Sequence, residues 1–240
     1  MVLMACQRCF RFDVAGMKRT TFFITGTNTG VGKTVLTALL TRHLRERGVN
    51  AVALKPVCSG DRVDARALHA ASAGTLTLDE INPWHFRAPM APLLAARRER
   101  KRVALADVLA HARTMQKRFD VVLIEGAGGL LSPLGENFDS RDLIVALCAT
   151  PMVVCPNRLG AVNQVLLTFT ALPRSASCRA RVVLMSPARP DASTSTNAGL
   201  LAEFLDTKRI FCLPYFGRRI DSEKVLKDSR VRRTFRVLVK

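Results

Sequence analysis

The feature that most constrains this chain is a series of short, wholly apolar segments separated by longer segments with helical periodicity. The apolar segments are Ala51–Leu54, Val121–Ile124, Met152–Cys155 and Val182–Met185. A strand that is apolar on both faces must be covered on both faces, as in a parallel sheet between two layers of helices. The alternation therefore predicts an α/β fold with a single doubly wound, mainly parallel sheet and helices on both faces.

Two further strands and several helices complete the predicted order. The strands are expected at Thr21–Thr25 and Ile210–Leu213. Apolar residues at helical spacing, with Gly48 and Gly74 placed to end two of the segments, predict the helices. These are expected at Lys33–Arg47, Asp61–Ala73, Val103–Arg118, Gly160–Leu172 and Asn197–Leu205. No internal repeat or low-complexity linker interrupts the series, so one domain is the simplest interpretation.

Length and composition agree with a single globular domain. The chain has 240 residues, of which 48% are hydrophobic, so disorder is excluded as its main state. No apolar run is long enough to span a bilayer as a helix, and we expect no membrane partner. The seven cysteines are odd in number and scattered, which is a poor basis for disulfides. A reducing, cytoplasmic location is therefore expected.

The charge balance is strongly basic. Lysine and arginine number 37 against 19 acidic residues, a net charge of +18, and residues 208–240 alone contribute +8. Such a field favours anionic partners in general. Tryptophan and tyrosine, two of the side chains that stack on bases, occur only once each in the sequence. We therefore expect small anionic substrates and no specific nucleic acid partner.

The two ends of the chain are set apart from the series of strands and helices. Residues 1–19 lack the features of a secretory signal, and Cys6 and Cys9 alone are a weak zinc half-site. Met17 stands as an alternative start. We expect an extension without regular structure over 1–19, a catalytic domain over 20–217 and a basic tail over 218–240. Residues 1–16 and the tail beyond about Asp221 are expected to be dispensable for chemistry, although apolar residues of the tail could pack as an amphipathic helix.

The strongest local motif is the segment Gly26–Thr34, with the sequence GTNTGVGKT. It lies between a predicted strand and a predicted helix, the context that a phosphate-binding loop requires. Glycines let successive backbone N–H groups point at phosphate oxygens, and the helix N-terminus adds partial positive charge. Lys33 supplies a full charge for the β- and γ-phosphates, and the Thr34 hydroxyl can ligate Mg²⁺. The motif predicts a P-loop NTPase-like domain that binds a nucleotide.

Further polar residues follow the ends of two other predicted strands. Glu125 ends Val121–Ile124 and precedes three glycines within four residues, so it is a candidate metal ligand. Lys55 ends the second strand, on the ligand side of such a sheet. Asp64, early in the following helix, is a second candidate ligand. Taken alone, Asp64 is better explained as a solvated acid at a helix start, and Lys55 could be a surface lysine at a loop.

Together these motifs resemble the dethiobiotin synthetase family. The matching stretches, in order, are Gly26–Thr34, Lys55–Gly60, Asn82-Pro83 with Pro89 and Pro92, Glu125–Gly129 and Leu159–Asn163. The five residues between Gly26 and Gly32, one more than the strict phosphate-loop pattern has, are the family's form. The resemblance extends from about Thr21 to Phe216.

The resemblance implies an activity. It is the ATP-dependent carboxylation of 7,8-diaminopelargonate by CO₂, followed by ring closure to dethiobiotin, with ADP and phosphate released. ATP is the co-substrate, Mg²⁺ the cofactor, and a homodimer the expected assembly. The implied catalytic residues are Lys55 and Lys33, and the implied metal ligands are Thr34, Asp64 and Glu125.

The resemblance also implies two sets of binding residues. Those expected to bind the nucleotide and its metal are Gly30, Val31, Gly32, Lys33, Thr34, Val35, Asp64, Glu125, Gly126, Ala127, Gly128, Ser186, Pro214, Tyr215 and Phe216. Those expected to bind the substrate are Thr29, Ser59, Leu159, Gly160 and Asn163, the last three through a loop that reaches across the dimer interface.

The chain departs from the family pattern at several positions. Asn28 stands where the family usually has aspartate, and Gly30 where it often has an acidic residue. Gln164 stands where the family usually has histidine. Ser186-Pro187 stands where the family usually has Asn-Asp, which reads adenine. Neither residue can make a two-pronged amide contact, so relaxed nucleotide selectivity is expected.

Three other functions remain to be weighed. A partitioning or septum-site ATPase shares the fold and would use the charge to contact DNA or membrane, but such proteins usually have an additional lysine early in the loop, where this chain has Thr27–Thr29. An amide-forming synthase of cobalamin synthesis needs an attached glutaminase domain, for which 240 residues leave no room. A basic binding protein without catalytic activity would not explain Lys55, Ser59 and Glu125.

Overall fold

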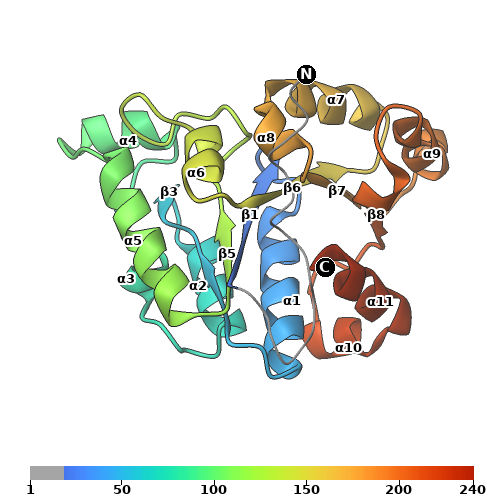
Figure 1. Ribbon diagram of the computed structural model, residues 1–240, viewed down its shortest axis with the longest axis horizontal. Helices are drawn as coiled ribbons and strands as arrows, with labels where there is room; N and C mark the ends of the chain where they lie inside the picture. The colour runs from blue at the N-terminus through green and yellow to red at the C-terminus, as the bar shows by residue number, and fades with distance from the viewer. Residues whose placement is uncertain (1–18) are drawn as a thin grey trace, which may run out of the picture.

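The computed structural model describes residues 19–240, so the extension expected before the first strand, with Cys6, Cys9 and Met17, lies outside the described residues apart from Arg19. A six-stranded sheet runs through the middle of the molecule, and helices lie on both of its faces (Figure 1). The strand order is β2-β5-β1-β6-β7-β8, and each pairing is parallel. The predicted fold class is confirmed.

The strands lie close to where the apolar runs placed them. Their bounds are β1 Thr20–Gly26, β2 Ala51–Leu54, β5 Val121–Glu125, β6 Thr150–Pro156, β7 Arg181–Met185 and β8 Ile210–Leu213. Side chains alternate between the two faces of a strand. In β1, Phe22 and Ile24 are buried against one helix layer, whereas Phe23 is buried against the other. This double burial explains why the strands have no polar face.

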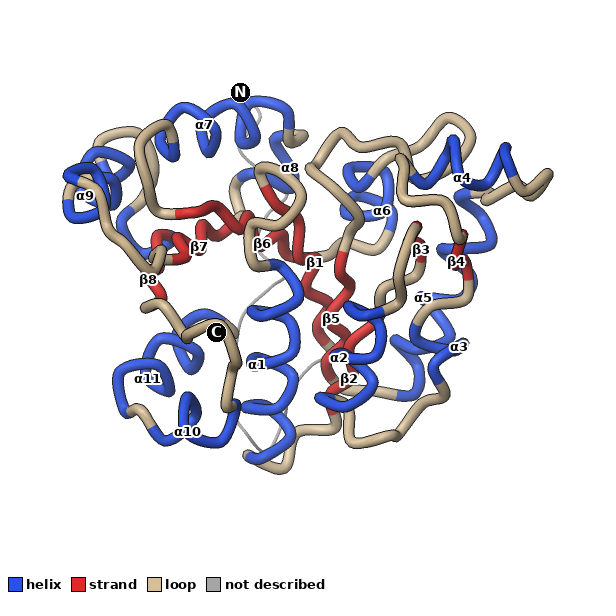
Figure 2. Tube along the Cα trace, turned by 180° about the vertical axis from the view of Figure 1, so that it is seen from behind, coloured by secondary structure: helices blue, strands red, loops and turns tan. Residues whose placement is uncertain are grey.

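The two helix layers differ in composition and size. On one face lie α1 (Lys33–Glu46), α10 (Ser222–Lys227) and α11 (Ser229–Leu238). On the other lie α5 (Leu105–Arg118), α6 (Ser140–Ala146), α7 (Ala161–Ala171), α8 (Arg174–Ser177) and α9 (Asn197–Ala202). The view from behind shows α1 crossing the sheet, with α10 and α11 beside it (Figure 2).

A smaller group of elements lies beyond β2. It contains α2 (Val63–Ala71), α3 (Leu78–Ile81), α4 (Pro92–Arg98) and a two-stranded parallel sheet of β3 (Val57–Ser59) and β4 (Trp84–Phe86). This small sheet was not predicted, because three-residue strands are too short to show a period. Two 3₁₀ turns, Ala192–Ser195 and Thr207–Arg209, complete the elements.

The segment expected to be a basic tail is part of the domain. Val231, Phe235 and Leu238 of α11 and Leu226 of α10 are buried against α1 and the sheet. Arg181, at the start of β7, donates to the carbonyl of Leu238. Its guanidinium also lies 5.6 Å from the centre of the Phe22 ring. The boundary drawn at residue 218 therefore does not separate a tail from the fold, although α11 does have the expected amphipathic pattern.

Several helix ends differ from the sequence-based bounds by a few residues. The helix expected from Asp61 begins at Val63, because the Asp61 carboxylate accepts a hydrogen bond from the Val63 N–H at 2.7 Å. The helix expected to continue to Leu205 ends at Ala202. None of the helices found in residues 19–240 is both long and apolar enough to cross a bilayer.

Candidate active site

The loop between β1 and α1 has the conformation of a phosphate-binding loop. Gly30 and Gly32 have φ angles of 72° and 100°, in the left-handed region that favours glycine. Gly32 is also the N-cap of α1, so the first N–H groups of this helix point into the loop. A Cβ atom at Gly26 would lie 2.6 Å from Val31 Cγ2, so the loop can close only around a glycine at this position.

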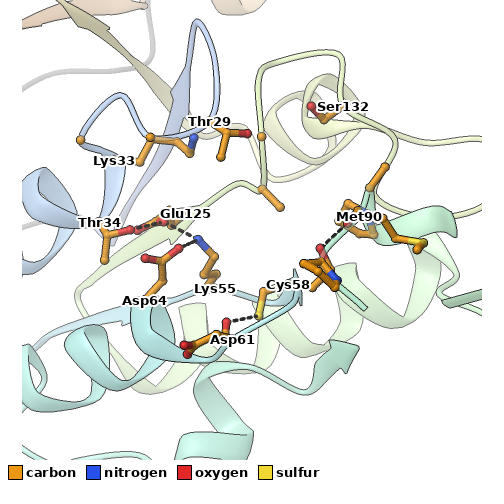
Figure 3. A pocket seen from close by; sticks show the side chains of 18 of the residues that line it. Thr29, Lys33, Thr34, Lys55, Cys58, Asp61, Asp64, Met90, Glu125 and Ser132 are labelled. Atoms are coloured by element: carbon orange, nitrogen blue, oxygen red, sulfur yellow. Dashed lines mark hydrogen bonds and ion pairs between the residues drawn. The ribbon is translucent and has the colours of Figure 1, made fainter. Parts of the chain in front are cut away.

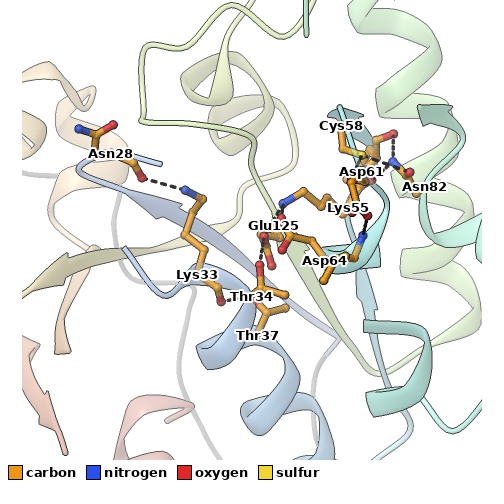
Figure 4. Close-up of polar contacts among 12 residues, drawn as sticks. Asn28, Lys33, Thr34, Thr37, Lys55, Cys58, Asp61, Asp64, Asn82 and Glu125 are labelled. Carbon is orange, nitrogen blue, oxygen red and sulfur yellow. Dashed lines mark hydrogen bonds and ion pairs between the residues drawn. The ribbon is translucent and has the colours of Figure 1, made fainter. Parts of the chain in front are cut away.

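Lys33 is folded back into this loop. Its ammonium donates to the carbonyl of Asn28 at 2.9 Å, and the side chain is almost fully buried (Figure 4). Burial and, to a smaller extent, the charge of Lys55 lower the pKa of Lys33, while Glu125 and Asp64 partly offset them, and the net result is a pKa of about 8. Bound phosphate oxygens would favour the charged form in the same way as these carboxylates.

The carboxylate of Glu125 lies at the C-terminal end of β5, the neighbour of β1 in the sheet. Its side chain is fully buried. Glu125 Oε1 accepts from Thr34 Oγ1 at 2.8 Å and from Lys55 Nζ at 2.6 Å. Parallel pairing of Ile24 with Glu125 brings the end of β5 beside the start of the loop. Two sequence-distant candidates, Thr34 and Glu125, are thus in direct contact.

Lys55 joins the second candidate carboxylate to this group. Its ammonium lies 2.5 Å from Asp64 Oδ2, so it bridges Asp64 and Glu125 (Figure 3). Burial by itself lowers the pKa of Lys55, but the two carboxylates outweigh burial and hold that pKa above its ordinary value. Burial likewise raises the pKa of Asp64, and the Lys55 charge more than reverses this. Lys55 is therefore a fixed cation and not a base.

The donor set around Lys55 fits a hard divalent cation. Glu125 Oε2 is buried and, among the residues that the structure describes, has no hydrogen-bond partner. An ionised oxygen without a partner is costly to bury unless a cation can reach it. Carboxylate and hydroxyl oxygens are the ligands that Mg²⁺ prefers. Residues 19–240 contain no group of three or more His, Cys, Asp and Glu side chains arranged for a metal. The hydroxyl of Thr34, in contact with Glu125, adds an uncharged oxygen to the two carboxylates.

These side chains open into a cavity of about 720 Å³. It is bounded by the phosphate-binding loop, by the ends of β2 and β5, and by the segment from Pro89 to Pro92. The sequence-predicted residues that line it are Thr29, Gly30, Gly32, Lys33, Thr34, Val35, Lys55, Ser59, Asp64, Glu125, Ala127 and Gly128. Val31 and Gly126 are buried beneath the lining and do not reach the cavity.

Ser59 and Cys58 form the wall opposite the phosphate-binding loop. Ser59 Oγ donates to the carbonyl of Met90 at 2.5 Å, so its lone pairs are free to accept from an amine. Burial raises the pKa of the Cys58 thiol, which makes it a poor nucleophile. The wall therefore offers hydrogen-bond acceptors and apolar surface.

Sequence reasoning assigned no role to Asn82, which holds the backbone behind Lys55. Its Nδ2 donates to the carbonyl of Lys55 at 2.7 Å, and its Oδ1 accepts from Arg62 Nε at 3.1 Å. Ser132, whose Oγ accepts from the Gly129 N–H, and Met90 also line the cavity without having been predicted. A sequence signal for Asn82 did exist. Asn82-Pro83 follows the Thr77–Glu80 capping box and marks a turn after a short helix.

The residues predicted to contact the base lie apart from this cavity. Ser186 follows β7, and its N–H donates to the carbonyl of Leu213 at 2.9 Å. Pro214 and Tyr215 are exposed after β8, and Phe216 is half-buried. The side chain of Met185 packs against Gly32, which links this region to the phosphate-binding loop.

The predicted substrate loop also lies outside the cavity. Leu159 is 79% exposed, and Gly160 and Asn163 are exposed at the start of α7. The Leu159 N–H donates to Asp191 Oδ2 at 2.8 Å, and this hydrogen bond holds the loop against the segment that contains Asp191. Within one chain, this loop and the cavity around Lys55 are separate.

Comparison with known proteins gives the family context. Residues 20–219 match the family described as an AAA domain. The chain is 40% identical over 198 residues to an ATP-dependent dethiobiotin synthetase of Anaeromyxobacter dehalogenans, covering 80% of this chain and 89% of the relative. It is 37% identical over 186 residues to a protein of the same name from Akkermansia muciniphila, covering 77% and 87%.

Solved structures share the fold. The chain aligns with a DNA-bound pNOB8 ParA protein with a TM-score of 0.54 at 12% identity, covering 92% of this chain and 97% of that chain. A plasmid partition protein of Borrelia burgdorferi bound to AMPPNP gives a TM-score of 0.53 at 13% identity, with the same coverage. At such identities the likeness supports the fold alone.

Proposed function

This chain belongs to the ATP-dependent dethiobiotin synthetase family, and we propose that it converts 7,8-diaminopelargonate, CO₂ and ATP into dethiobiotin, ADP and phosphate in biotin biosynthesis. One observation carries the proposal within the structure: Lys55, bridging Asp64 and Glu125, faces the phosphate-binding loop across one cavity. Such a site can hold a phosphoryl group and a second small anion side by side.

The reaction needs three bond-forming steps. One amine of the substrate attacks CO₂ and loses a proton, giving a carbamate. A carbamate oxygen attacks the γ-phosphorus of ATP and ADP leaves. The second amine then attacks the carbonyl carbon, the ureido ring closes, and phosphate leaves. The second step brings two anions together, and all three steps need the reacting groups held in place, so positioning and positive charge are the main requirements.

The lysines meet this requirement. Lys33 and the N–H groups of the loop from Gly30 to Thr34 hold the β- and γ-phosphates. Lys55 is charged throughout, because two carboxylates raise its pKa, and its ammonium steadies the carbamate and the oxygens of the transferring phosphoryl group. Ser59 and Thr29 accept or donate hydrogen bonds at the substrate end of the cavity.

Thr34, Asp64 and Glu125 would hold Mg²⁺, which supplies charge neutralisation of the nucleotide phosphates when bound. Val35, Ala127 and Gly128 shape the walls around the phosphates, and Val31 and Gly126 support these walls from beneath. Ser186 and the segment Pro214–Phe216 would contact the nucleoside end. Because Ser186-Pro187 lacks a side-chain amide, base selectivity is expected to be weak.

The exposed loop with Leu159, Gly160 and Asn163 fits a role across a subunit interface. It lies outside the cavity of its own chain, and Leu159 is 79% exposed there, so the loop is accessible to a second subunit. We propose a homodimer in which this loop completes the substrate site of the other subunit. Cytoplasmic location and the absence of a specific nucleic acid partner complete the proposal.

The test is release of ADP by the purified full chain. ADP release should require both diaminopelargonate and bicarbonate, and dethiobiotin should form in equal amount. ADP release that is independent of the diamine, or stimulated by DNA instead, would support the partitioning-type ATPase. A variant with Ser177→Ala, which lies in α8 away from the cavity, is the matched control for protein handling.

A further inference from the structure

A second cavity, of about 370 Å³, lies at the C-terminal end of α1, between this helix and the pair α10 and α11. Figure 2 shows the two short helices beside the lower part of α1, at the opposite end from the phosphate-binding loop. Side chains from all three helices line the cavity. It shares no residue with the cavity around Lys55.

The lining is cationic. Arg42, Arg47, Lys227 and Arg232 face Glu46 and Glu223, so the lining carries a net charge of +2. Both acids are already used by Arg42, at 3.3 Å and 3.4 Å. Within residues 19–240, the side chains of Arg47, Lys227 and Arg232 make no ion pair. These three exposed cations, from the end of α1 and from α10 and α11, therefore lie around one hollow without an ion-pair partner of their own in residues 19–240.

A buried polar atom lies in the wall of the same cavity. His43 lines it, is only 3% exposed, and its Nε2 has no hydrogen-bond partner among the described residues. The rings of His43 and Phe235 pack against each other in a T-shaped arrangement. Burial, together with the charges of Arg47, Arg232 and Arg236, lowers the pKa of His43 to about 4. These arginines thus create a strong positive potential at the imidazole.

The partial negative charge at the C-terminus of α1 offsets some of this potential, because cations are favoured there. Half an elementary charge does not balance three cations, however, so the hollow keeps a positive potential that attracts a small anion. Guanidinium groups are the side chains best matched to the oxygens of phosphate, which they bind in two-pronged fashion.

We propose that this cavity, at the junction of α1, α10 and α11, binds a small phosphorylated anion through Arg47, Lys227 and Arg232. The enclosure by three helices favours a compact ligand over an extended polyanion. The anion would replace the missing counter-ions and offer an acceptor to a protonated His43. This site does not depend on the proposed synthetase activity.

The experiment titrates inorganic pyrophosphate into the full chain after the phosphate-binding loop is saturated with a non-hydrolysable ATP analogue. Binding is measured by calorimetry at about 0.15 M salt, where exposed charges are screened beyond ~8 Å. The double variant Arg47→Gln, Arg232→Gln should bind pyrophosphate about tenfold more weakly or worse, because two charge-assisted contacts are lost.

The matched control is Arg230→Gln, Arg233→Gln. This control also removes two positive charges, both from α11, but neither residue lines the cavity. We expect it to bind pyrophosphate nearly as well as the unmodified chain. Equal weakening in both double variants, or no binding of pyrophosphate, would overturn the proposal. Binding of a DNA duplex in preference to pyrophosphate, lost equally in both variants, would overturn it in favour of an extended basic surface.

A second readout separates a ligand site from a structural effect of the substitutions. Pyrophosphate should raise the pKa of His43 in the unmodified chain, followed through its imidazole signals by NMR and assigned with His43→Gln. The signals of His69, which does not line this cavity, serve as the internal reference. A His43 signal that pyrophosphate leaves unchanged would count against the site.

Discussion

The two ends of helix α1 treat buried charge in opposite ways. At the N-terminal end, each buried cation has oxygen partners: Lys33 contacts the carbonyl of Asn28, and Lys55 bridges Asp64 and Glu125. At the C-terminal end, Arg47, Lys227 and Arg232 gather around a neutral histidine without ion pairs in residues 19–240. The same helix thus connects a site where the cations have oxygen partners with a site where three cations have no ion pair.

The difference shows how the local partners decide the state of a titratable group. Burial lowers the pKa of both Lys55 and His43, but two carboxylates reverse the effect at Lys55 and three arginines deepen it at His43. A buried charge is therefore retained at one end of α1 and excluded at the other. The following predictions test each half of this contrast.

The largest effect is expected for Lys55→Met. This change removes the cation that two carboxylates hold charged, and turnover should fall by about a thousandfold or more, as for other groups that face a transferring phosphoryl group. Dethiobiotin formation at saturating substrates measures it. Lys101→Met, an exposed lysine outside the cavity, is the control. Near-normal turnover in Lys55→Met, with the fold intact by circular dichroism, would remove Lys55 from the mechanism.

Next in size is the effect of Phe235→Ala on stability. The ring is fully buried between α11, α1 and the sheet, so its loss should lower the free energy of unfolding by about 3–5 kcal/mol. Urea denaturation measures this. Arg233→Ala, an exposed neighbour on the same helix, should change stability by about 0.5 kcal/mol or less. Equal stability of the two variants would mean that the end of the chain is a tail after all.

The acid sensitivity of the C-terminal end gives a smaller, pH-dependent effect. The pKa of His43 is lowered from 6.5 to about 4 in the folded chain, so the unfolded chain binds the proton more readily. This group's contribution to stability is complete above pH 6.5, and is lost as the pH falls towards 4 at up to about 1.4 kcal/mol per pH unit.

His43→Leu should remove that part of the pH dependence. The measurement is the free energy of unfolding from pH 4 to 7.5 for both chains. The charged side chains that face or lie near the imidazole remain in both chains, so the difference between the two curves isolates His43. They are Arg42, Glu46, Arg47, Glu223, Lys227, Arg232 and Arg236. Parallel curves would show that His43 is not shielded in the folded chain.

The smallest effect concerns the nucleoside. If the N-terminal end of α1 supplies most of the binding of the nucleotide, the base should matter little. Without a two-pronged amide contact, discrimination should be reduced by about 1–3 kcal/mol, by analogy with amide readout of adenine. Turnover with ATP, CTP and GTP measures it. A preference for ATP above a thousandfold would mean that another group reads the base.

The sequence by itself determined the fold class and the phosphate-binding loop. Strands that are apolar on both faces must be covered by helices on both faces. The glycines of Gly26–Thr34 shape the phosphate-binding loop within a few residues of one another. Both signals are local, and local signals survive in a single sequence. All six strands of the main sheet lie where the apolar runs placed them, to within one or two residues.

Only the tertiary structure decided which distant residues meet. Parallel register brings Glu125 beside Thr34, and the turn after β2 brings Lys55 between Asp64 and Glu125, contacts that no spacing in the sequence encodes. The role of Asn82 behind Lys55, and the packing of Phe235 on α1, depend on the same long-range contacts. The physical reason is that burial and ion pairing are properties of three-dimensional neighbours. The sequence shows which charges exist, and the fold decides which of them have partners.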